Sequence, residues 1–150
     1  MTTADVTWAD ALQAIASVIG FLIVIYQIRE LRRVVQSDTH SKLYAHYLEV
    51  NKLLLQNSHL RPYFYDRKIL EESDLNQPNL RQDVDMMCEV VLGLLEHAVL
   101  QKTNLPDDSW QNCWMVYVYE RYQKSPELAK FFSANRKWYA RSLCDLLEAT

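Results

Sequence analysis

The stretch ALQAIASVIGFLIVIYQI, residues 11–28, contains no charged side chain and is followed at once by Arg29, Arg32 and Arg33. As an α-helix, a stretch of this length rises roughly 27 Å, close to the roughly 30 Å thickness of the hydrocarbon core of a bilayer. The sequence therefore predicts a transmembrane helix. We assign residues 1–34 to this helix and its basic end, and residues 35–150 to a second domain.

The basic residues around the apolar stretch predict its orientation. No lysine or arginine precedes residue 11, whereas the three arginines follow within five residues of Ile28. Because lysine and arginine near the ends of a span are retained in the cytoplasm, we expect the N-terminus outside and residues 35–150 in the cytoplasm.

Two other interpretations of residues 11–28 stay open. A cleaved signal peptide has a similar apolar segment, but its positive N-terminal region and small-residue cleavage site are missing here. A buried helix of a soluble domain also fits, since Gln13, Ser17 and Gln27 dilute the stretch and its length is near the lower limit for a span.

The polar and small residues of the expected helix form one stripe. With Val24 they recur at steps of three and four residues, which places these six on one side: Asp10, Gln13, Ser17, Gly20, Val24 and Gln27. Polar side chains in hydrocarbon seek partners on neighbouring helices, and small residues allow helices to approach closely. With one span per chain, the partner is another chain, and we predict a homo-oligomer with packed helices. A ring with a narrow wet pore and the absence of specific association remain alternatives.

Residues 35–150 are predicted to fold as one small cytoplasmic bundle of four or five helices. The whole chain has only two glycines and four prolines, and no sustained alternation of apolar and polar residues. Its net charge of −3 does not indicate nucleic-acid binding. The cysteines, Cys88, Cys113 and Cys144, lie far apart and are interpreted as reduced core residues. Because metal-ligand spacings and nucleotide fingerprints are missing from the sequence, we expect no metal and no cofactor.

Apolar periodicity predicts where these helices lie. Residues 37–56 form an amphipathic segment, either a second helix or an extension of the first, that Pro62 stops. Residues 81–102 form the next helix. A third helix is expected to begin at a cap formed by Asp108 or Ser109 and to end at about residue 122. Ser125 is expected to form the next N-cap, and a closing helical segment is expected over residues 130–147. A ligand cage is an alternative to core packing for four aromatic residues, Tyr63, Tyr65, Trp110 and Trp114.

The histidines give only weak catalytic candidates. His97 lies beside Glu96, but adjacent residues on a helix do not face each other. His40 follows Arg33 with six residues between them, a spacing similar to the loose Arg-x(4–6)-His motif of HEPN ribonucleases, which cleave RNA without a metal. We predict that the protein is not an enzyme, with Arg33 and His40 as the weak candidates.

The order of parts resembles a widespread bacterial family of single-pass proteins of unknown function, with RPYFYD at residues 61–66 and SPELAKFFSANRKWYARSL at residues 125–143. It is also similar in architecture to the membrane-anchored accessory protein of type VI-B CRISPR systems, whose cytoplasmic part is HEPN-like and which assembles into a ring-shaped pore. That family carries Arg-Asn-x-x-x-His near its C-terminus, where this chain reads NRKWYAR at residues 135–141, without histidine.

The resemblance implies an oligomeric effector of phage defence in a bacterial inner (plasma) membrane. Its implied partners are the lipid bilayer, copies of itself, and a cytoplasmic protein or an RNA-guided effector. Three functions stay open: a membrane-anchored oligomer that alters permeability, a non-enzymatic anchor or scaffold, and a tethered HEPN-type ribonuclease.

Overall fold

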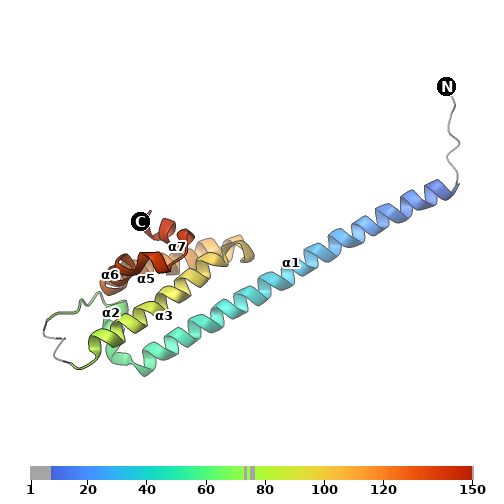
Figure 1. Ribbon diagram of the computed structural model, residues 1–150. Coiled ribbons are helices and arrows are strands. Elements are labelled where there is room, and N and C mark those ends of the chain that lie inside the picture. The colour runs from blue at the N-terminus through green and yellow to red at the C-terminus, as the bar shows by residue number, and fades with distance from the viewer. Residues whose placement is uncertain (1–7, 73, 75–76, 150) are drawn as a thin grey trace. The chain divides into compact units, whose positions relative to one another are not determined.

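The computed structural model describes residues 8–72, 74 and 77–149, and the regular secondary structure in this part is entirely helical (Figure 1). The predicted all-α class is confirmed. The helices in chain order are α1 (Trp8–Gln56), α2 (Arg61–Tyr65), α3 (Leu80–Leu100), α4 (Asp107–Ser109), α5 (Met115–Gln123), α6 (Pro126–Asn135) and α7 (Arg141–Glu148). Short 3₁₀ turns occupy Ser58–Leu60, Lys102–Asn104 and Arg136–Trp138, and a π-helical turn occupies Trp110–Trp114.

The chain divides into two compact units, and the division falls within α1, between Ser37 and Asp38. The first unit is the N-terminal part of α1. It contains an 18-residue window with a mean hydropathy of 2.1, and α1 is the one helix among the described residues that is long and apolar enough to cross a membrane.

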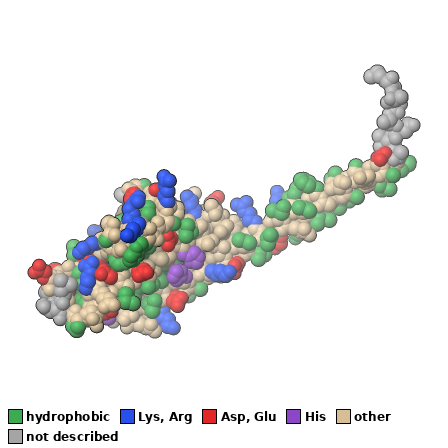
Figure 2. Space-filling model, in the orientation of Figure 1, with side chains coloured by type: hydrophobic (Ala, Val, Ile, Leu, Met, Phe, Trp, Pro, Cys, Tyr) green, Lys and Arg blue, Asp and Glu red, His purple; other side chains and the backbone are tan. Residues whose placement is uncertain are grey.

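The apolar window of α1 is exposed among the described residues. None of it is buried, and Ile19, Phe21 and Ile23 are each more than half exposed. In Figure 2 hydrophobic side chains cover much of the visible face of this stretch, and basic side chains begin at its C-terminal end. A core helix of a soluble protein would be mostly buried, so the exposure of this window does not favour that interpretation.

The second unit begins with the remainder of α1, which contributes Leu43, Val50 and Leu54 to the core. The predicted helical segment over 37–56 is confirmed as a direct continuation of the same helix. The prediction that Pro62 stops this helix is wrong. Helix α1 already ends at Gln56, and Pro62 lies in the first turn of α2.

Helix α3 is the centre of the second unit. Its bounds, Leu80–Leu100, agree closely with the predicted helix over 81–102, and α6 and α7 both pack against it. Ten of its residues are buried, so both of its flanks are covered, as expected for a central helix. The remaining core side chains come from α1, α2, α5, α6 and α7 and from connecting segments, among them Phe64, Val118, Leu128 and Leu143.

The N-cap of α6 is the predicted one. The Ser125 hydroxyl accepts a hydrogen bond from the Leu128 N–H (3.1 Å) and donates one to the Tyr63 carbonyl (2.8 Å), and Ser125 is fully buried. One side chain thereby caps α6 and joins it to α2.

The predicted closing helical segment over 130–147 is interrupted. Helix α6 ends at Asn135, and α7 begins at Arg141 after a 3₁₀ turn. The extended residue Ala140 precedes α7, and its N–H donates to the Glu96 carboxylate of α3. A contact with a distant helix therefore fixes this break.

The prediction for the cysteines holds for two of the three. Cys88 and Cys144 are buried, whereas Cys113 is exposed, and all three are free thiols. Burial raises the pKa of the Cys88 thiol well above its usual value, so Cys88 is unreactive at neutral pH.

Candidate functional site

The six residues of the predicted stripe are exposed along the first unit. The Ser17 hydroxyl donates to the Gln13 carbonyl one turn earlier (2.8 Å), so its donor is already satisfied inside the helix. The side-chain amides of Gln13 and Gln27 have no hydrogen bond within the described residues. A Cβ added at Gly20 would meet no atom of the described residues within 4 Å, so packing within them does not require a glycine there.

The basic end of the apolar stretch is exposed to solvent. Arg29, Arg32 and Arg33 are exposed, and Arg33 pairs with Glu30 one turn earlier at 3.5 Å. The other weak catalytic candidate, His40, belongs to the second unit, where it lines a pocket.

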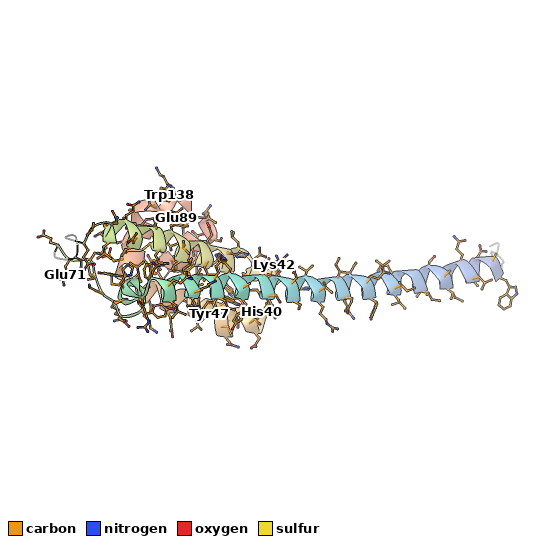
Figure 3. All side chains as sticks on the ribbon, turned by 90° about the horizontal axis from the view of Figure 1, so that it is seen from below. His40, Lys42, Tyr47, Glu71, Glu89 and Trp138 are labelled. Carbon is orange, nitrogen blue, oxygen red and sulfur yellow. The ribbon has the colours of Figure 1, made fainter. Side chains whose placement is uncertain are left out.

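An open pocket of about 380 Å³ lies in the second unit. The part of α1 beyond Ser37 supplies three of its lining residues, and the segment from the π-helical turn into α5 supplies the others: His40, Tyr44, Tyr47, Cys113, Trp114 and Tyr117. Figure 3 shows His40 and Tyr47 on the same side of α1. We call these six residues the aromatic pocket.

Ring contacts fix the walls of the aromatic pocket. Tyr47 meets Trp114 and Tyr117 in edge-to-face pairs at centroid distances of 6.2 and 5.3 Å, and Trp114 and Tyr117 meet edge to face at 6.0 Å. Tyr44 stacks on Tyr47 at 5.8 Å while remaining half exposed. Such edge-to-face packing holds rings in defined orientations, so the inner walls are rigid and Tyr44 forms an open side.

The π-helical turn shapes one wall of the aromatic pocket. The predicted cap at Asp108 or Ser109 is wrong, because the helix begins at Asp107 and continues through the π turn into α5. The turn buries Trp110 and Trp114 together and leaves Cys113 exposed. Turns of this kind occur frequently at functional sites.

The aromatic cage considered as an alternative to core packing does not form. Of its four members only Trp114 lines the aromatic pocket, while Tyr63 and Trp110 are buried and Tyr65 lines a different pocket with Arg61. Sequence reasoning missed Tyr44, Tyr47 and Tyr117. The available signal was the spacing of His40, Tyr44 and Tyr47, since residues three and four apart on a helix are neighbours.

A guanidinium group lies close to the aromatic pocket. The Arg121 guanidinium is 5.0 Å from the ring centroid of Tyr117 and 3.7 Å from that of Tyr65. Its Nε and Nη1 atoms are buried without a hydrogen-bond partner among the described residues. Burial raises the pKa of Tyr117 to about 12, so the Tyr117 phenol stays protonated at neutral pH.

Two histidines join α1 to α3. Nδ1 of His46 lies 3.3 Å from Nδ1 of His97, and both side chains are partly buried. One ring must donate and the other accept, so the contact requires that at least one of them is neutral. Glu96 does not assist His97, because its carboxylate binds the Ala140 N–H instead. No group of three or more possible metal ligands occurs among the described residues.

The histidine pair predicts loss of stability in weak acid. Burial, and then the neighbouring His46, lower the pKa of His97 in the folded protein. The unfolded chain titrates near the ordinary value of about 6.5 and therefore binds more protons below it, so the free energy of unfolding decreases as the pH falls through that value. We expect a lower Tm at pH 5 than at pH 7.5, measured by circular dichroism, and a smaller pH dependence in His97→Gln. The matched control is His59→Gln at an exposed position; equal pH dependence in all three proteins would contradict this assignment.

No protein-family model, curated protein or solved structure matches the chain.

Proposed function

We propose that this protein is a single-pass membrane protein whose first helix self-associates in the bilayer and whose helical domain acts on the cytoplasmic side. The observation that carries the proposal is the exposed apolar window of α1, of which no part is buried by the rest of the described chain. An apolar surface of this extent needs a cover in water. Apart from the polar stripe this surface covers the helix, and lipid is a cover that fits it.

The charges at the two ends support the orientation. The exposed Arg29, Arg32 and Arg33 follow the window, and no basic residue precedes it in the sequence. This asymmetry favours a cytoplasmic location for the second unit.

The polar stripe supports association between copies. The amides of Gln13 and Gln27 lack partners within the described chain, and hydrogen bonds to another helix would satisfy them in hydrocarbon. Gly20 lies between them and would allow two helices to approach closely. Ser17 contributes less, because its hydroxyl already binds the Gln13 carbonyl.

The stripe leads to a direct test of self-association. Gln13→Leu combined with Gln27→Leu removes both unpaired amides while keeping the span apolar. Each such contact contributes roughly 0.6–1.7 kcal/mol. The oligomer of the double variant is therefore expected to dissociate at a protein concentration roughly tenfold or more above that at which the parent dissociates. The measurement is the mass of the particle in detergent, by light scattering, over a dilution series.

The control for this test is Ser17→Ala, which lies on the same stripe but removes a hydroxyl that is satisfied inside its own helix. It is expected to keep the parent's mass. A parent that is monomeric at every concentration, or a double variant that dissociates like the parent, would overturn the proposed self-association.

We propose further that the assembly alters membrane permeability, as the resemblance to the accessory proteins of type VI-B CRISPR systems implies, and that it serves bacterial antiviral defence. What supports this step is the same stripe, since a ring of helices that turns Gln13 and Gln27 inward has a polar centre. Conductance across a planar bilayer, present for the parent and lost in the double variant, is the expected result. Replacement of the whole span by an unrelated one without loss of function would indicate a scaffold instead.

A further inference from the structure

The aromatic pocket has the dimensions of a small-molecule site. Its volume of about 380 Å³ is at the lower end of the range of ligand pockets, roughly 300–1,000 Å³. All six lining residues belong to the second unit, so the site does not depend on the membrane-spanning part of the chain.

The lining favours a flat, unsaturated ligand. Four of its six side chains are aromatic, and these rings are held by edge-to-face and stacked contacts. Tyr44 is half exposed, so a planar ring can stack on it from the open side. His40, Cys113 and the tyrosine hydroxyls add polar atoms that can bind the edge of a heteroaromatic ring.

The charge around the pocket selects between two kinds of ligand. Aromatic walls also suit cations such as quaternary ammonium groups. However, no acidic residue lines this pocket, and the Arg121 guanidinium already lies 5.0 Å from the Tyr117 ring. A second positive charge is therefore disfavoured, whereas a neutral or anionic ligand is not.

We propose that the aromatic pocket binds the planar heteroaromatic ring of a small neutral or anionic molecule, with the half-exposed Tyr44 as the stacking wall and His40 as a hydrogen-bond partner. The exposed thiol of Cys113 reports occupancy, because a ligand in the pocket covers it. Cys88 and Cys144 are buried and serve as internal references in the same chain.

The test measures the rate at which iodoacetamide alkylates Cys113, by mass spectrometry of the full-length protein in lipid nanodiscs. Three probes differ in charge: adenosine is neutral, adenosine monophosphate is anionic and choline is cationic. Adenosine and adenosine monophosphate are expected to slow the alkylation of Cys113, whereas choline leaves it unchanged. Protection by choline but not by adenosine, or no protection up to the solubility limit of each probe, would overturn the proposal.

Two variants separate stacking from a general effect on the surface. Tyr44→Ala removes the open wall and is expected to weaken adenosine binding about tenfold or more, the effect of losing one base–aromatic stack. Val116→Ala truncates an exposed side chain of α5 that does not line the pocket, and is expected to bind like the parent. Equal affinity of parent and Tyr44→Ala would exclude the aromatic pocket as the binding site.

Discussion

The double substitution Ile19→Lys with Ile23→Lys is expected to release the protein from the membrane fraction. Both side chains are about half exposed in the middle of the apolar window. Each lysine at the centre of a span costs about 2.5–3.5 kcal/mol, whereas each Leu, Ile, Val or Phe contributes only about 0.3–0.6 kcal/mol. Residues 11–28 contain ten of these apolar residues, which together favour membrane insertion by about 3–6 kcal/mol. The cost of two lysines cancels this favourable insertion free energy.

The measurement is the share of protein that stays with membranes after extraction at alkaline pH. Leu48→Lys with Leu55→Lys is the matched control, since both leucines are exposed on the same helix but lie in the second unit. We expect the control to remain with the membrane like the parent. If alkaline extraction also releases the parent, the helix does not span the bilayer.

Long-range features of the sequence made the helical class and the first helix predictable. An uncharged stretch of this length, in a chain with two glycines and four prolines, leaves little alternative to a continuous helix. Helix α3 was equally clear, because its apolar positions recur over many turns. The cap at Ser125 was readable from three consecutive residues, since serine, proline and glutamate each have a defined place at a helix start.

The errors occur where a distant contact decides the local structure. The sequence predicts a helical segment throughout residues 130–147. The break before α7 is explained by the hydrogen bond from the Ala140 N–H to Glu96, a residue far away in the sequence. Arg136, in the turn between the two helices, then pairs with Glu148 at the end of α7. Neither partner is identifiable from local periodicity.

The aromatic pocket illustrates the same limit for the candidate site. The spacing of His40, Tyr44 and Tyr47 shows that they share a face of α1, but not which segment lies opposite. The π-helical turn that brings Cys113 and Trp114 there has a helical sequence without any distinctive breaker. The lining could therefore be predicted from the α1 side only.

Glu127→Ala is expected to destabilise the second unit by about 2–3 kcal/mol and to lower the Tm by about 10 °C. Glu127 is 2 % exposed, and its carboxylate accepts a hydrogen bond from the Leu70 N–H at 3.0 Å. It also lies 3.5 Å from Arg81 of α3 and in the first turn of α6, where a negative charge is favourable. Alanine removes these interactions together and leaves a partly buried backbone donor without its partner.

Two further variants separate the hydrogen bond from the charge. Glu127→Gln keeps an oxygen for the Leu70 N–H, and Arg81 retains its ion pair with Asp85 at 3.0 Å, so this variant is expected to lose much less stability than Glu127→Ala. Glu120→Ala removes an exposed carboxylate paired with Lys124 on α5, and its expected cost is below about 1 kcal/mol. The measurement is thermal unfolding followed by circular dichroism at neutral pH. A Glu127→Gln variant as unstable as Glu127→Ala would mean that charge, rather than the bond to the segment before α3, is what Glu127 contributes.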